Sequence, residues 1–78
     1  MKPSDLEYAQ TAAMRLGCSV NELRVWPAPG IERGFFFSSG DILGASRILI
    51  DKGGQQLWRP SAVSEAKHIE QFAAGQRN

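Results

Sequence analysis

The chain holds a single histidine, His68, and a single cysteine, Cys18, two side chains that often serve as nucleophiles, bases or zinc ligands. Cys18 follows Gly17 at the expected end of a helix, whereas thiols are activated at a helix N-terminus or beside a cation. A zinc site takes about four ligands, which this pair does not supply. We interpret His68 as a solvated surface residue and Cys18 as a small, buried or half-buried one, and we expect no metal or cofactor.

The remaining candidates for chemistry are carboxylates and glycines, and neither forms a motif. The eight carboxylates are scattered, and no two have the spacing of a paired general acid and base. Gly30, Gly34 and Gly40 do not form a phosphate loop, because no Lys-Ser or Lys-Thr pair follows them and no helix begins there. Asp51 stands before Lys52-Gly53-Gly54 and is expected to accept hydrogen bonds within a turn. We therefore predict a protein that is not an enzyme.

Aromatic residues are the stronger functional signal. Trp26 and Trp58 each end an expected strand beside proline or Arg-Pro, and tryptophan is enriched in binding hot spots. Tryptophan is also large enough to cover a small core, so both interpretations stay open. Phe36 points away from Phe35 and Phe37 and would be partly exposed if helices cover only one sheet face, leaving an apolar patch. With three charged residues as a rim, the predicted partner-binding set is Trp26, Arg33, Phe36, Asp41, Trp58 and Arg59.

Two helices should frame this surface. Ser4 and Glu7 have capping-box spacing, an apolar stripe follows, and Gly17 suits the left-handed residue after a helix, which predicts a helix over about residues 4–16. Near the other end, Pro60 ends a strand, Ser61 caps a second helix and Gly75 stops it. The apolar face of that second helix is expected to hold Ala62, Ala66, Ile69 and either Phe72 or Ala73.

Residues 18–26 allow two interpretations. Ser19 and Glu22 repeat the capping-box spacing, which would start a short helix. Leu23 and Val25 alternate with polar or interfacial neighbours, which favours a strand over residues 22–26, and we prefer the strand. A helix here would complete a helix-turn-helix motif with Asn21 and Arg24 as base readers, so the alternative function is a small DNA-binding regulator or an excisionase-like protein.

The central part of the chain predicts antiparallel strands. Aromatic residues 35–37 form one strand core, residues 47–51 form the clearest strand, and residues 51–54 form a hairpin turn that leads into a strand over 56–58. The expected fold is a small α+β domain of three to four antiparallel strands with an N-terminal and a C-terminal helix. Both helices are expected on one sheet face, burying Leu6, Leu16, Phe35, Phe37, Ile48, Ile50, Ile69 and Phe72.

Length and charge narrow the partners. Seventy-eight residues make one domain, 1–78, with a net charge of +1. This balance argues against bulk nucleic acid or an anionic membrane as partner. The longest apolar runs have three residues, so no segment is expected to cross a bilayer, and one cysteine fits a reducing cytoplasm. An exposed edge strand would also allow two copies to pair as a homodimer.

The order of these motifs resembles the YrhB-like family of small bacterial immunity proteins. The resemblance rests on Gly34 followed by three phenylalanines, on Gly44, on Ile48-Leu49-Ile50-Asp51-Lys52 with Gly54, and on Ile69-Glu70-Gln71-Phe72 in a closing helix. It implies an α+β fold and a protein that binds and neutralises a bacterial toxin by steric occlusion. The matching residues are mostly structural, so the resemblance assigns no functional residue.

Overall fold

The computed structural model describes residues 3–39 and 46–78, with side chains in the first helix described from Glu7 onward. The roles predicted for the side chains of Ser4 and Leu6, and that of Asp41, lie outside the described residues. The elements are α1 (Pro3–Leu16), the 3-10 turn η1 (Val20–Glu22), β1 (Arg24–Pro27), β2 (Phe35–Ser38), β3 (Arg47–Ile50), β4 (Gln56–Arg59) and α2 (Glu65–Ala73). The predicted α+β class and the order α-β-β-β-β-α are confirmed.

The four strands form one antiparallel sheet in the order β1-β2-β3-β4. Trp26 pairs with Phe36, Phe36 with Leu49, and Leu49 with Leu57, so these four side chains form one row across the sheet. Successive residues of a strand point to opposite faces. The neighbouring row, which contains Phe37 and Ile48, therefore lies on the other face.

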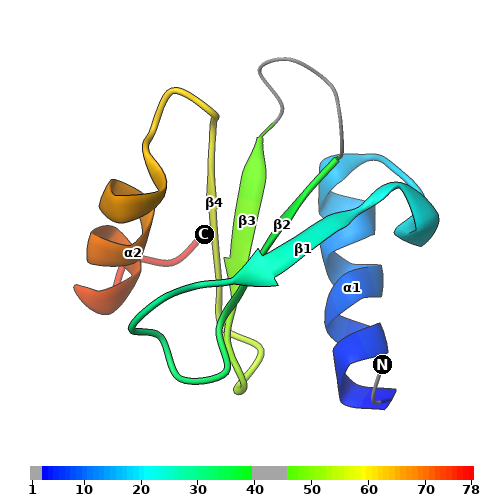
Figure 1. The fold of residues 1–78 in the computed structure, drawn as a ribbon, viewed down its shortest axis with the longest axis horizontal. Helices are drawn as coiled ribbons and strands as arrows, with labels where there is room; N and C mark the ends of the chain where they lie inside the picture. Colours follow the sequence, from blue (N-terminus) through cyan, green and yellow to red (C-terminus); the bar gives the residue numbers. More distant parts are fainter. Residues whose placement is uncertain (1–2, 40–45) are drawn as a thin grey trace.

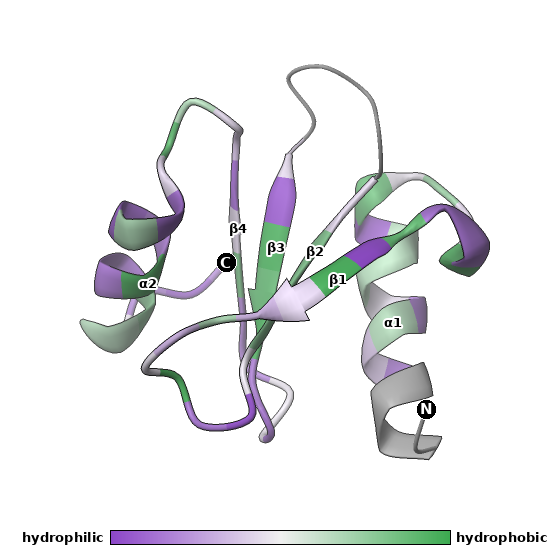
Figure 2. Cartoon of the chain, in the orientation of Figure 1, coloured by the Kyte–Doolittle hydropathy of each residue, from purple (hydrophilic) through white to green (hydrophobic). Residues whose placement is uncertain are grey.

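The two helices cover opposite faces of this sheet, as Figure 1 shows with α1 and α2 on either side of the strands. Helix α1 packs on β2 and β3, and α2 packs on β3 and β4. The prediction that both helices share one face is therefore wrong. The physical reason is β3, which is buried at all four positions and hydrophobic along most of its length (Figure 2). A strand that is apolar on both faces needs cover on both sides.

Two hydrophobic clusters follow from this arrangement. The α1-side core is built from Ala9, Ala12, Phe37, Ile48 and Ile50. The α2-side core is built from Ala28, Phe36, Leu49, Leu57 and Phe72. The predicted core set is thus divided between two layers.

Helix α1 agrees with its predicted bounds. Ala9 and Ala12 are fully buried, and their small side chains allow the helix to approach the sheet closely. Gly17 follows the helix with a φ of 72°, the left-handed conformation expected of a glycine there.

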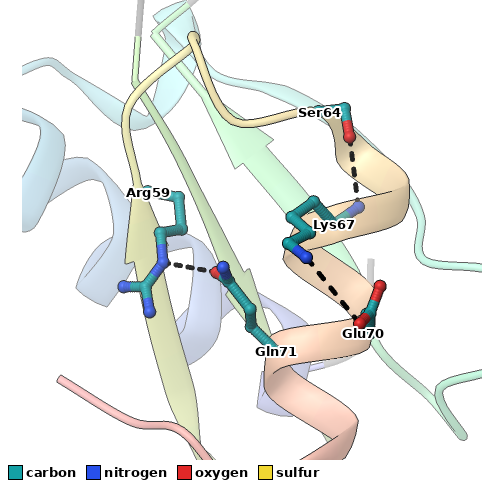
Figure 3. Close-up of polar contacts among 5 residues, drawn as sticks. All are labelled: Arg59, Ser64, Lys67, Glu70 and Gln71. Carbon is teal, nitrogen blue, oxygen red and sulfur yellow. Dashed lines mark hydrogen bonds and ion pairs between the residues drawn. The ribbon is translucent and has the colours of Figure 1, made fainter.

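Helix α2 begins later than predicted. Ser64, rather than Ser61, is its N-cap, and the Ser64 hydroxyl accepts a hydrogen bond from the Lys67 N–H at 3.2 Å (Figure 3). Residues 60–63 instead form a turn closed by the Val63 N–H and the Pro60 carbonyl. At the other end, Gly75 with a φ of 95° stops the helix, as predicted.

Candidate functional site

The hydrogen-bond pattern of the sheet determines which backbone groups face its two open sides. The Ala28 N–H donates to the Gly34 carbonyl at 2.9 Å. Hydrogen-bonded pairs alternate with non-hydrogen-bonded pairs along an antiparallel ladder, so two residues earlier Trp26 and Phe36 bond to each other. The N–H and C=O of Val25 therefore point away from β2, toward the outer side of β1.

The opposite side of the sheet is closed by the chain itself. By the same alternation, starting from the Asp51 N–H bonded to the Gln55 carbonyl at 3.1 Å, the backbone groups of Gln56 and Trp58 point outward from β4. The Asn78 side chain covers Trp58, accepting from its N–H at 2.7 Å and donating to its C=O at 3.2 Å. The Asn78 N–H donates to the Gln56 carbonyl at 3.4 Å. Asn78 thus substitutes for a fifth strand.

Two arginines hold this closing tail in place. Arg77 donates to the Gln55 side chain at 2.9 and 2.6 Å and stacks 3.8 Å from the Phe72 ring centroid. Arg15 donates to the Asn78 carbonyl at 2.8 Å and to the Gln56 side chain at 2.9 Å. Both arginines line an open depression beside β4. Because their guanidinium groups bond to oxygens of the chain itself, we interpret the depression as a structural clamp.

The outer side of β1, residues Arg24–Pro27, is called the β1 edge here, and no strand of the described residues pairs with it. Among residues 3–39 and 46–78, no group bonds to the outward N–H and C=O of Val25. Val25 is 45% exposed, because α1 lies over β2 and β3 and does not reach β1. Pro27 has no N–H to donate and limits pairing to a short segment. The β1 edge is therefore a short, open pairing surface centred on Val25.

Trp26 forms the α2-facing part of the β1 edge. Its indole N–H donates to the Glu65 carboxylate at 2.6 Å, and its ring lies 5.6 Å from the Phe36 ring. Trp26 is half-buried, so part of a rigidly held aromatic surface faces solvent. Phe36 itself is fully buried, and the expectation of a partly exposed Phe36 is wrong because α2 packs on that face.

Arg33 lies in the loop that joins β1 to β2. It is exposed and has a φ of 53°, in the left-handed region that glycine favours. The next residue, Gly34, is buried, and a Cβ there would lie 2.4 Å from the Ile31 side chain. The loop therefore requires a glycine at 34 and holds Arg33 outward, close in sequence to the β1 edge.

Trp58 and Arg59 lie on the other side of the sheet, in β4. Trp58 packs against the α1-side core, and Arg59 is held by the side chains of Gln71 at 2.6 Å (Figure 3) and Gln76 at 2.7 Å. The structure thus places Trp26 on β1 at one side of the sheet and Trp58 and Arg59 on β4 at the opposite side. Arg33 lies in the loop after β1, next to Glu32, which pairs with Lys52 of the β3–β4 turn at 3.0 Å. The predicted set is not one continuous surface.

His68 is fully buried rather than solvated, so its predicted environment is wrong. Its Nε2 donates to the Leu57 carbonyl at 2.6 Å, and its Nδ1 accepts from Arg47 at 3.2 Å, which is the pattern of a neutral ring protonated on Nε2. Burial lowers the pKa of His68, and the positive charge of Arg47 also lowers it. His68 lies one helical turn before Phe72, and this i,i+4 spacing is the sequence signal for its burial. With both nitrogens occupied, His68 is not poised as a general base.

Two further predictions concern Cys18 and the DNA-binding alternative. Cys18 is half-buried, as predicted, and burial together with Glu22 raises the pKa of its thiol. Val20–Glu22 forms one 3-10 turn, and Arg24–Pro27 forms a strand. The second helix of a helix-turn-helix motif is therefore not formed there. Within the described ranges, no three histidine, cysteine or acidic residues lie close enough together to hold a metal ion.

The chain was also compared with known proteins. No protein-family model, characterised protein or solved structure matches it. Neither of the described helices has the length and hydrophobicity of a segment that spans a bilayer.

Proposed function

We propose that this chain is a cytoplasmic protein-binding domain that captures an extended segment of another protein along the β1 edge. The observation that carries the proposal is the contrast between the two sides of the sheet. Asn78 occupies the outward groups of β4, whereas the described chain leaves those of Val25 in β1 open. Open strand edges bind extended peptides through main-chain hydrogen bonds.

The side chains around Val25 would give specificity to the binding of an extended peptide. Val25 projects toward the α1 side and Trp26 toward the α2 side, so alternate side chains of a bound segment would meet two different surfaces. Trp26 is an apolar anchor already fixed by Glu65. Anchors that are ordered before binding lose little conformational entropy on association. Arg33 is an exposed charge in the following loop.

Binding can be tested with phage-displayed random peptides and the isotope-labelled chain. Selected peptides should be rich in residues that favour strands and should shift the backbone amide resonance of Val25 but not that of Trp58. The matched variants are Val25→Pro, which removes the outward N–H, and Val25→Thr, which keeps it. Proline is tolerated where the N–H faces solvent on an edge strand. Val25→Pro should weaken binding at least about tenfold, and equal binding by both variants would contradict the proposal.

A narrower proposal follows from the resemblance to immunity proteins: the captured partner is a bacterial toxin, which the domain neutralises by covering its surface. Co-expression with each neighbouring gene product that arrests growth would test it. Growth rescue by the native chain and by Val25→Thr, but not by Val25→Pro, supports toxin capture at the β1 edge. Rescue by all three chains would place the contact elsewhere.

A further inference from the structure

The β1 edge is complementary to itself. A twofold axis through an antiparallel strand pair sets residue i opposite residue j and residue j opposite residue i. Val25 has both an outward N–H and an outward C=O, so Val25 of two copies can exchange two hydrogen bonds. We propose that the first occupant of this edge is a second copy of the chain, paired antiparallel with Val25 opposite Val25. The inference uses the edge on which the proposed function rests.

The charges around Val25 favour this register. When Val25 faces Val25, Arg24 of each copy stands opposite Trp26 of the other. Arg24 and Trp26 lie on the same face of β1, so this register sets the Arg24 side chain beside the Trp26 ring of the other copy, on the face where Glu65 bonds to the indole. The contact repeats on both sides of the axis. Cross-strand pairs of this kind stabilise a sheet, whereas like charges placed opposite destabilise it.

The neighbouring registers fit less well. Setting Val25 opposite Leu23 would place Arg24 opposite Arg24, and the Leu23 N–H is already bonded to the Val20 carbonyl at 3.2 Å. Setting Val25 opposite Pro27 leaves the Val25 carbonyl without a donor, because proline has no N–H. Only the register centred on Val25 uses both outward groups and separates the arginines.

The short ladder sets the strength of the pairing. Pro27 ends the ladder on one side and the turn at Leu23 ends it on the other, so the interface is much smaller than that of a permanent dimer. We expect a dissociation constant in about the 10 µM–1 mM range. Such a dimer would cover the edge at high concentration and still release it to a tighter-binding partner.

Disulfide trapping tests the register directly. In a Cys18→Ser background, Val25→Cys places two thiols in a hydrogen-bonded pair, whose Cα atoms lie about 5.5 Å apart, within the range of a disulfide. The matched control is Met14→Cys in the same background, because Met14 is 84% exposed on α1. On mild oxidation at equal concentration, Val25→Cys should give at least about tenfold more covalent dimer. Equal yields from the two variants would overturn the inference.

Sedimentation equilibrium is the second test of self-pairing. The native chain and Val25→Thr should self-associate reversibly, and Val25→Pro should weaken self-association at least about tenfold while keeping its circular dichroism spectrum. A native chain that stays monomeric at 1 mM, about the weakest binding expected, would overturn the inference. If Val25→Pro does not fold, the trapping yields decide alone.

The two proposals fail in different ways. Peptide binding by a chain that stays monomeric would support the proposed function and reject self-pairing. Self-association without any peptide binding would support self-pairing and reject capture of an extended segment.

Discussion

Arg33 has a φ of 53°, and it is the only non-glycine residue of the described chain with a positive φ. A non-glycine residue in the left-handed region costs the folded chain roughly 1–2 kcal/mol. Glycine removes most of this cost, but it also gives the unfolded chain more conformational freedom, which lowers the free energy of unfolding by about 0.5–1 kcal/mol. We therefore expect Arg33→Gly to raise the free energy of unfolding by about 0.5–1 kcal/mol. Thermal denaturation should show a melting temperature higher by about 2–8 °C.

Arg33→Ala is the matched control for this prediction. Alanine removes the same charge but keeps the unfavourable φ, so its melting temperature should stay close to that of the native chain. If the glycine and alanine variants melt together, backbone strain at Arg33 does not limit stability. Because Arg33 is exposed in the loop that follows β1, peptide binding by Arg33→Ala also measures its contribution as a predicted rim charge.

His68 makes stability depend on pH. Burial lowers its pKa in the folded chain below the ordinary value of 6.5, so the unfolded chain binds the proton more readily. The free energy of unfolding is therefore highest above about pH 6.5 and falls as the pH drops from 7 toward 5, by at most about 1.4 kcal/mol per pH unit for one proton. Arg47, Arg59 and Glu65 are the charged groups that act on this ring.

Urea denaturation of the native chain and His68→Gln between pH 5 and 7 would measure this dependence. Glutamine keeps an N–H donor for the Leu57 carbonyl but does not titrate. We expect the variant to be less stable at pH 7 and to lose most of the dependence on pH in this range. An unchanged slope would show that other groups cause it.

Asn78 is expected to protect the backbone of strand β4, because its side chain bonds to the outward groups of Trp58. Asn78→Ala removes both side-chain hydrogen bonds to Trp58, whereas Asn78→Asp keeps only the acceptor for the Trp58 N–H. Each net hydrogen bond contributes about 0.5–1.5 kcal/mol. Hydrogen exchange of the Trp58 amide should accelerate by about 3–10-fold in Asn78→Ala and less in Asn78→Asp. The Phe37 amide, which points to β3, is the internal control, and equal acceleration of both amides would indicate global destabilisation instead.

The elements themselves follow from local residue types, and their arrangement does not. The hairpin at Asp51 is confirmed, with its carboxylate accepting from the Gly53 and Gln55 N–H groups at 2.9 and 3.0 Å. The sequence does not determine where α2 begins, because Ser61 and Ser64 both suit an N-cap. A tertiary contact decides between them, since Arg47 binds the Val63 carbonyl and holds the turn before the helix.

The candidate site was predicted only in part for the same reason. Alternation shows which face a residue occupies, but it does not show which strand lies at the edge of the sheet. The residue type of Trp26 includes it in the proposed site, whereas Val25 enters that site only through its outward backbone groups, which its residue type does not indicate. Pro27 was the available signal, since proline in a strand marks an edge. Asn78, far along the chain, determines that the other edge is closed.

The molecule as a whole is a sheet between two helices, and each of the two hydrophobic cores has one tryptophan packed against it. Trp26 packs on the α2-side core and Trp58 on the α1-side core. Both cores are built on the same strands, because Ile48 and Leu49 are neighbours in β3 and face opposite ways. A domain of this size has about 4–12 kcal/mol of stability, which is too little to support two independently folded layers.

This shared sheet predicts a single cooperative transition. Leu57 is fully buried in the α2-side core, so Leu57→Ala should cost about 2–5 kcal/mol. In Trp26→Phe and Trp58→Phe backgrounds, the remaining tryptophan reports on one layer at a time. Urea transitions followed by fluorescence should coincide in the two backgrounds, and Leu57→Ala should shift both by the same free energy. A shift confined to the Trp26 signal would mean that α2 and its core unfold separately from the layer under α1.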